Sequence, residues 1–156
     1  MSYTELASGT TPAPALSPPT QQSPADETIL LVEDEAFVRE VTCEILESAG
    51  YRVLKARNAA EADTRFRSHR KIVKLLLADV VLPGQNGRDL ANDLRAMNSA
   101  LRVIFISGYP LNLVTQKRLV EDGMFYLPKP FSAESLLRKV RQVLARERFR
   151  RVCDTA

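Results

Sequence analysis

The sequence predicts an α/β fold in which a parallel five-stranded sheet is covered by helices on both faces. Short, almost wholly apolar runs recur along the chain, as in buried parallel strands. Between these runs apolar residues return at helical spacing, and this alternation is typical of successive βα units. We expect a flavodoxin-like (βα)5 three-layer sandwich with strand order 2-1-3-4-5, which binds ligands at the carboxyl ends of its strands.

Each apolar run is followed by a segment with helical signals. Gly50 stands where a helix C-terminal cap is expected, and Asn58 with Glu61 resembles a capping box that opens the second helix. Ser132 is expected to cap a last helix that ends near Arg148. The expected strands are residues 28–32, 51–56, 73–78, 101–106 and 124–127, and bounded helices are expected at 58–69, 111–121 and 132–148.

The chain has 156 residues, about the length of one domain. Residues 1–26 are rich in Pro, Ser and Thr and show no regular period, which predicts a disordered tail. We expect the folded domain at 27–148 and a short C-terminal tail at 149–156. Because the sequence has neither an apolar run of roughly 18–20 residues nor a secretory signal, we expect a cytoplasmic protein that does not enter a membrane.

Basic residues gather near the C-terminal end, although the formal net charge is only +3. Such a cluster can attract nucleic acid, but a solvated helix face is its more common cause. We therefore do not expect nucleic acid as a partner. Cys43 and Cys153 lack metal-binding spacing and are expected to be reduced and without a role. The basic residues are Arg138, Lys139, Arg141, Arg146, Arg148, Arg150 and Arg151.

Polar side chains stand at the ends of four of the five expected strands. Glu33 and Asp34 follow the first strand, Asp79 the third, Ser107 the fourth and Lys129 the fifth. In a parallel sheet the carboxyl ends lie at one edge, so we expect these side chains to converge. A single acid there has a simpler explanation, such as a helix cap for Asp34 or Glu35. The convergence of all five groups instead indicates a site.

The chemistry of the three acids predicts a divalent cation and phosphate. Clustered carboxylates repel one another unless a cation is present. Mg²⁺ fits this cluster, because it takes one or two carboxylates, keeps several waters and binds phosphate oxygens. Asp79 is the expected nucleophile toward a phosphoryl group, with Lys129 neutralising the phosphoryl oxygens and Ser107 donating a hydrogen bond to them.

Four motifs at the strand ends carry a resemblance to a known family. They are LLVEDE at the first strand, ADVVLPGQNG at the third, FISG at the fourth and YLPKPF at the fifth. These motifs resemble the response regulator receiver domains of two-component signalling, over about residues 27–146. The segments ISGYP and FYLPKPFS are most similar to the corresponding segments of receivers of hybrid histidine kinases.

The resemblance implies a phosphorelay function for the acid cluster. Asp79 is implied to be the phosphoacceptor, which takes a phosphoryl group from a phosphohistidine of a sensor histidine kinase or a histidine phosphotransfer protein. Mg²⁺ is implied to bind Glu33, Asp34, Asp79 and the backbone carbonyl of Val81, while Lys129 contacts the phosphate. The product is an aspartyl phosphate.

The resemblance also implies a conformational switch. The Ser107 hydroxyl is implied to move toward the phosphate and the Tyr126 ring to turn inward. The surface of the fourth helix, fifth strand and fifth helix then changes its affinity for a downstream protein. Family members also pair through this surface, which leaves a homodimer open. The bond between Lys129 and Pro130 is implied to be cis.

We interpret the chain as a single-domain response regulator without a DNA-binding output domain. It is expected to catalyse only its own phosphorylation and dephosphorylation and not to be an enzyme in the usual sense. Two other classes stay open at this point. A phosphohydrolase with an Asp nucleophile usually needs a second acid two residues later, where Val81 stands. A nucleic-acid-binding regulator would use the basic last helix, but no helix-turn-helix follows it.

The two residues after the phosphoacceptor are less usual. Val80 and Val81 are apolar where many receiver domains carry a polar side chain. The Val81 side chain cannot orient a water molecule. We therefore hypothesise that a phosphate on Asp79 hydrolyses no faster than in relatives with an amide at the position of Val81.

Overall fold

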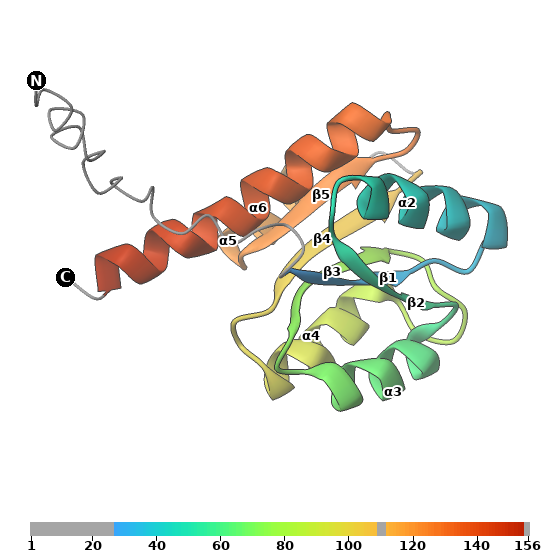
Figure 1. Cartoon of the computed structure of the whole chain (residues 1–156), viewed down its shortest axis with the longest axis horizontal. Coiled ribbons are helices and arrows are strands. Elements are labelled where there is room, and N and C mark those ends of the chain that lie inside the picture. Colours follow the sequence, from blue (N-terminus) through green and yellow to red (C-terminus); the bar gives the residue numbers. More distant parts are fainter. Residues whose placement is uncertain (1–26, 109–111, 155–156) are drawn as a thin grey trace, which may run out of the picture.

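The computed structural model of the chain describes residues 27–108 and 112–154. The tail expected at residues 1–26 lies outside the described residues. Strands and helices alternate over the described part (Figure 1). In chain order the elements are β1 (Thr28–Val32), α2 (Ala36–Ser48), β2 (Arg52–Ala56), α3 (Ala59–His69), β3 (Val73–Asp79), α4 (Gly87–Met97), β4 (Arg102–Ser107), α5 (Leu113–Glu121), β5 (Met124–Pro128) and α6 (Ala133–Asp154).

The strands form one five-stranded sheet in the order β2-β1-β3-β4-β5, and every pairing in it is parallel. The predicted fold class and strand order are therefore confirmed. Val32 pairs with Ala78 where β1 and β3 meet, and Ser107 pairs with Pro128 where β4 and β5 meet. These pairings bring the carboxyl ends of the strands to the same edge of the sheet.

Helices cover both faces of the sheet, and each face has its own apolar core. Successive side chains of a strand point to opposite faces. Leu30 of β1 accordingly packs with side chains of α3, α4 and α5, while Ile29 and Leu31 pack with side chains of α2 and α6. Figure 1 shows α3 and α4 on one side of the sheet and α2 and α6 on the other.

Local sequence signals explain where the helices begin. The Asn58 side chain accepts a hydrogen bond from the Glu61 amide (2.8 Å), and the Ser132 hydroxyl accepts one from the Ser135 amide (3.0 Å). Both predicted N-terminal caps are thus confirmed. Gly50 follows α2 with a φ of 98°, a conformation that favours glycine and ends the helix as expected.

The last helix is longer than the sequence analysis expected. α6 continues to Asp154, six residues beyond its expected end near Arg148, so most of the segment expected as a short tail at 149–156 is helical. Residues 148–154 contain neither Gly nor Pro, and therefore nothing in the sequence stops the helix there. None of the described helices is both long and apolar enough to cross a membrane.

Candidate functional site

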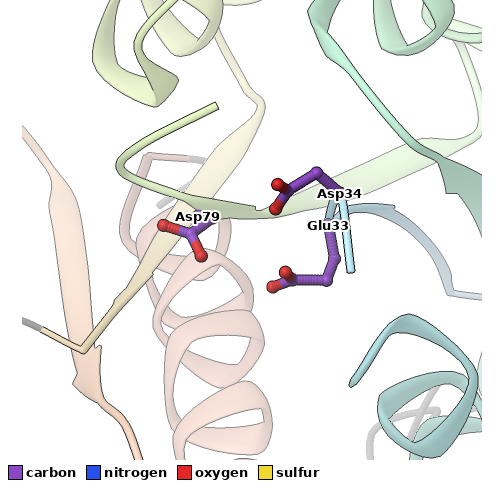
Figure 2. Close-up of side chains that lie close together, drawn as sticks. All are labelled: Glu33, Asp34 and Asp79. Atoms are coloured by element: carbon purple, nitrogen blue, oxygen red, sulfur yellow. The ribbon is translucent and has the colours of Figure 1, made fainter. Parts of the chain in front are cut away.

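Three acids meet at the carboxyl edge of the sheet, as the strand order predicts. Glu33 and Asp34 follow β1, and Asp79 is the last residue of the neighbouring strand β3. One carboxylate oxygen from each lies within 4.8 Å of those of the other two. Figure 2 shows the three side chains close together, with those of Glu33 and Asp34 directed to the side on which Asp79 lies. Glu33 is buried, Asp79 is half-buried and Asp34 is exposed, so the cluster opens to solvent on one side.

Lys129 joins two of these acids. Its Nζ lies 3.0 Å from Glu33 Oε2 and 2.9 Å from Asp79 Oδ2. The lysine directly follows β5, and its side chain reaches past the end of β4 to the acids at β1 and β3. Asp34 forms no ion pair with a described residue, so three carboxylates share the charge of one lysine.

The surroundings of the ion pairs shift two pKa values. Burial raises the pKa of Glu33, and the hydrogen bond and charge of Lys129 only partly counteract this effect. Burial alone would lower the pKa of Lys129, but its hydrogen bonds to Asp79 and Glu33 outweigh burial and leave the pKa above its ordinary value. The lysine is therefore protonated. The charge of the lysine does not fully offset the effect of burial on Glu33, and a further cation nearby would favour its ionised form.

The donor set fits a hard divalent cation. Carboxylate oxygens are the ligands that Mg²⁺ prefers, and the ion usually keeps waters and leaves room for phosphate oxygens. The exposed Asp34 and the open side of the cluster fit this partly hydrated coordination. Glu33, Asp34 and Asp79 are thus the residues that would hold Mg²⁺, in agreement with the cation that the sequence predicts.

Backbone contacts fix the position of Asp79. Its Oδ1 accepts a hydrogen bond from the Val81 amide at 3.0 Å, while Lys129 holds the other oxygen. The Gly87 amide donates to the Val80 carbonyl at 2.7 Å, which brings the start of α4 against this loop. A Cβ atom at Gly87 would collide with the Asp79 carbonyl oxygen. Gly87 therefore allows the close approach of α4 to the loop that begins at Asp79.

Ser107 and Tyr126 lie on the two strands next to the acid cluster. Ser107 ends β4 and is buried, and its carbonyl accepts a hydrogen bond from the Lys129 amide at 2.8 Å. Tyr126 is half-buried on β5 and packs against the core on the α3, α4 and α5 side of the sheet. The peptide bond between Lys129 and Pro130 is cis. Ser107 and Lys129 thus lie at the carboxyl edge of the sheet, while Tyr126 lies in the middle of β5 and pairs with Phe105.

Neither Asp34 nor Glu35 provides a side-chain cap for α2. The residue that caps α2 is Glu35, and its side chain makes no capping hydrogen bond. Instead the Glu33 carboxylate accepts a hydrogen bond from the Glu35 amide at 3.3 Å. The side chain of Asp34 remains available to a cation.

Sequence reasoning missed Arg39. Its Nη1 donates a hydrogen bond to the Glu33 carbonyl oxygen at 2.8 Å and lies 3.5 Å from that of Asp34. Near the N-terminal end of a helix a cation is disfavoured by the helix dipole. A basic residue in the first turn of α2, directly after the acids, was the signal that could have identified this contact.

Known proteins share both this sequence pattern and this fold. The family model described as the response regulator receiver domain matches residues 29–141. Sensor kinase CckA of Brucella abortus is 33% identical over 120 residues, which are 77% of this chain and 13% of that protein. A probable transcriptional regulatory protein of Picosynechococcus is 31% identical over 126 residues, which are 78% of this chain and 50% of that protein.

Solved structures agree with these relatives. The receiver domain of the hybrid histidine kinase CckA is 35% identical with a TM-score of 0.65, over 75% of this chain and 98% of that one. A CheY-like receiver domain protein of Methanospirillum hungatei is 26% identical with a TM-score of 0.70, over 80% of this chain and 98% of that one. The predicted likeness to hybrid kinase receivers is confirmed. The chain spans at most half the length of these two curated relatives.

Proposed function

This chain belongs to the response regulator receiver domain family, and on that premise we propose that it is a phosphoacceptor switch that acts through Asp79. The donor is the phosphohistidine of a sensor histidine kinase or of a histidine phosphotransfer protein. The observation that carries the proposal is the joint placement of Asp79, Lys129 and two further acids at one open edge of the sheet.

Two hydrogen bonds orient the Asp79 carboxylate, one of whose oxygens attacks phosphorus in the proposed reaction. Hydrogen bonds from the Val81 amide and from Lys129 fix the direction of the carboxylate. One carboxylate oxygen forms a bond to phosphorus while the bond from phosphorus to the imidazole nitrogen breaks, and its electron pair returns to the imidazole. Bound Mg²⁺ supplies charge neutralisation for the phosphoryl oxygens. Lys129 supports this by neutralising a further phosphoryl oxygen.

The site fits a single transfer to the protein better than turnover of a free substrate. A phosphohydrolase would need an acid to protonate the leaving group, and the side chain two residues after Asp79 is that of Val81, which is apolar and 61% exposed. Autophosphorylation and a slow loss of the phosphate are the reactions we assign to the chain. That it forms a single-domain protein stays a prediction, because the curated relatives extend well beyond the matched segment.

The structure supports a route from the site to a binding surface. The Lys129 amide is bonded to the Ser107 carbonyl, and Phe105 of β4 pairs with Tyr126 of β5. A movement of the Ser107 hydroxyl toward a phosphate therefore acts on the strand pair that carries Tyr126. The surface of α5, β5 and α6 would change with it and bind a downstream protein in one state.

An apolar groove beside the acids supports docking of the phosphoryl donor. The groove has a volume of about 570 Å³ and lies between α2 and the loop that follows β5. Phe37 and Val41 on its α2 side are 75% and 39% exposed. Such exposed apolar side chains next to a charged site mark a protein-binding surface. The lining residues are Phe37, Val38, Val41, Thr42, Ile45, Lys129, Pro130 and Phe131.

Phosphate incorporation tests the central proposal. With Mg²⁺ and a small acyl phosphate, the protein should gain one phosphoryl group, which is measured as a mass increase and lost at alkaline pH. Asp79→Asn should gain none. Asp63→Asn is the matched control, because Asp63 is an acid that pairs with Arg67 on α3, and this variant should be labelled like the wild type. Labelling that persists in Asp79→Asn would overturn the assignment.

A second experiment separates donor docking from chemistry. Phe37→Glu should slow phosphotransfer from a histidine kinase or phosphotransfer protein but leave labelling by a small acyl phosphate unchanged. Ile72→Glu is the control, because Ile72 is also an exposed apolar residue (46%) but precedes β3 at the opposite edge of the sheet. Equal effects of both substitutions on phosphotransfer would contradict a specific groove.

A further inference from the structure

The turn between β1 and α2 carries two of the three acids and lacks the usual helix cap. Glu33 still follows the sheet, because its amide donates to the Ala56 carbonyl at 3.1 Å. The chain then turns through Asp34 to Glu35, whose side chain makes no capping hydrogen bond. The carboxylates that this turn presents repel each other and Asp79 when no cation is bound. Within the turn the Glu33 carboxylate accepts a hydrogen bond from the Glu35 amide at 3.3 Å, and a second contact spans the turn from α2.

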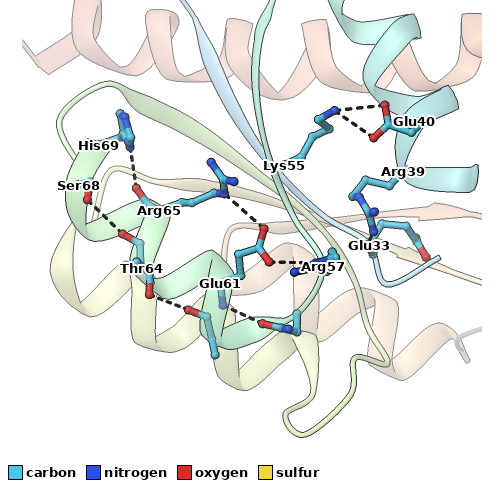
Figure 3. A network of polar contacts seen from close by, with 12 residues as sticks. Glu33, Arg39, Glu40, Lys55, Arg57, Glu61, Thr64, Arg65, Ser68 and His69 are labelled. Atoms are coloured by element: carbon cyan, nitrogen blue, oxygen red, sulfur yellow. Dashed lines mark hydrogen bonds and ion pairs between the residues drawn. The ribbon is translucent and has the colours of Figure 1, made fainter. Parts of the chain in front are cut away.

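Arg39 makes that contact. Its backbone amide donates to the Glu35 carbonyl at 2.9 Å, which places the arginine in the first turn of α2. Its Nη1 reaches back over the turn to the Glu33 carbonyl oxygen at 2.8 Å, with that of Asp34 at 3.5 Å. Figure 3 shows the Arg39 side chain directed toward Glu33. One guanidinium thus contacts the backbones of both acids that precede α2.

The contact is to the backbone of the acids and not to their carboxylates. In the described part of the chain no carboxylate lies within ion-pair distance of Arg39. The guanidinium therefore does not occupy the carboxylate oxygens, and it holds the backbone of the two residues to which they belong. A charged donor makes a stronger hydrogen bond than a neutral one, and residues that orient metal ligands in this way strengthen metal binding.

We propose that Arg39 is a positioning residue for the Mg²⁺ site: it clamps the turn between β1 and α2 so that the carboxylates of Glu33 and Asp34 face Asp79. The inference rests on the Mg²⁺ site of the proposed function and goes beyond it, because Arg39 touches neither the ion nor the phosphate. It acts by lowering the reorganisation that ion binding requires.

The direction in which Arg39→Gln changes the affinity for Mg²⁺ distinguishes a positioning role of Arg39 from a purely electrostatic one. Removal of a positive charge near a cation site strengthens cation binding by Coulomb's law. Loss of a clamp weakens it. If Arg39 acts only through its charge, Arg39→Gln binds Mg²⁺ more tightly than the wild type, and if it positions the turn, Arg39→Gln binds Mg²⁺ more weakly.

The test is a Mg²⁺ titration of the full chain, in which binding is measured by calorimetry and by changes in amide chemical shifts. For Arg39→Gln we expect a dissociation constant about 10-fold higher, at the lower end for residues that orient metal ligands. Arg39→Lys should be intermediate, because it keeps the charge but replaces the planar guanidinium, whose Nη1 contacts both carbonyls, by a compact and strongly hydrated ammonium group. Lys55→Gln removes the same charge from a neighbouring exposed ion pair with Glu40 (Figure 3) and should bind at least as tightly as the wild type.

Phosphorylation by a small acyl phosphate provides a second readout. The Mg²⁺ concentration for half-maximal labelling should rise in Arg39→Gln, while the rate at saturating Mg²⁺ stays within twofold of the wild type. Tighter or unchanged Mg²⁺ binding in this variant would overturn the inference. If Arg39→Gln does not fold, Arg39→Lys decides by the same comparison. A wild-type protein that binds no Mg²⁺ would instead refute the proposed function itself.

Discussion

Replacement of Lys129 by methionine tests whether repulsion among the clustered carboxylates destabilises the folded protein. Methionine keeps most of the length and packing of the lysine stem but removes the ammonium group. The two ion pairs to Glu33 and Asp79, at 3.0 and 2.9 Å, are lost together. Three carboxylates then face one another without the lysine that balanced two of them.

The burial of the ion pairs sets the magnitude. The side chains of Glu33 and Asp79 are 4% and 14% exposed, while that of Lys129 is 24% exposed. Removal of one partner from a fully buried ion pair costs about 3–5 kcal/mol. Solvent reaches this lysine in part, and exposed pairs contribute about 1 kcal/mol or less. Between these limits we expect Lys129→Met to lower the free energy of unfolding by about 2 kcal/mol at pH 8 without Mg²⁺.

The loss should depend on pH because Glu33 can take up a proton. Burial raises its pKa above the ordinary value of 4.5, and Lys129 counteracts that rise. Without the lysine the pKa rises further. A carboxyl whose pKa is higher in the folded than in the unfolded protein favours folding at low pH, and this contribution is lost as the pH rises through the folded pKa. The deficit of Lys129→Met should therefore be smaller at pH 5 than at pH 8.

Urea denaturation with a metal chelator, at pH 5 and pH 8, measures both effects. Lys55→Met is the control, because the ion pair of Lys55 with Glu40 is exposed (41% and 54%) and its loss should cost much less than that of the Lys129 pairs at either pH. Mg²⁺ should restore part of the stability of Lys129→Met. The reasoning is refuted if Lys129→Met matches the wild type at pH 8, or if its deficit is the same at both pH values.

Three further outcomes are expected. Gly87→Ala should lower the free energy of unfolding by about 2 kcal/mol, because its Cβ would meet the Asp79 carbonyl, whereas Gly108→Ala has open space and should be neutral in the same denaturation assay. Mg²⁺ at 100 times its dissociation constant should stabilise the wild type by about 2.7 kcal/mol in denaturation curves, and the same concentration should stabilise Asp34→Asn less. Val81→Asn should lose its phosphate at least as fast as the parent in a radiolabel chase. Slower loss would contradict the hypothesis that a phosphate on Asp79 hydrolyses no faster here than in relatives with an amide at the position of Val81.

The fold was predictable because β1 and most of β3 and β4 are apolar runs. β1 has the predicted bounds, and β3 differs only by the inclusion of Asp79. Burial on both faces demands apolar residues at every position of such strands, so neither helical periodicity nor alternation obscures them. The end of α6 was predicted less well, because a helix that extends beyond the core is limited by stop signals, and residues 148–154 contain no Gly or Pro.

The site was predictable to the level of strand ends but not of side-chain contacts. Strand order places Glu33, Asp79 and Lys129 at one edge, and this follows from the topology alone. That Lys129 reaches both acids, across the end of β4, depends on the length and direction of one flexible side chain. Arg39 was missed because its partner is a backbone carbonyl, so the sequence offers only the unusual position of a basic residue in the first turn of α2 and does not identify the atom that it contacts.

The double ion pair gives Lys129 a specific part in the proposed switch. An uncharged lysine would leave Glu33 and Asp79 unbalanced, and a lysine bound to only one of them would leave the other without a partner. In the proposed phosphorylated state Asp79 carries the phosphoryl group, so the ammonium must exchange its contact with Asp79 for one with a phosphoryl oxygen. The Lys129 amide is bonded to the Ser107 carbonyl at 2.8 Å. The exchange would therefore take place on the residue whose amide already joins the end of β4 to the start of the loop after β5, and this bond would link the proposed exchange to Ser107.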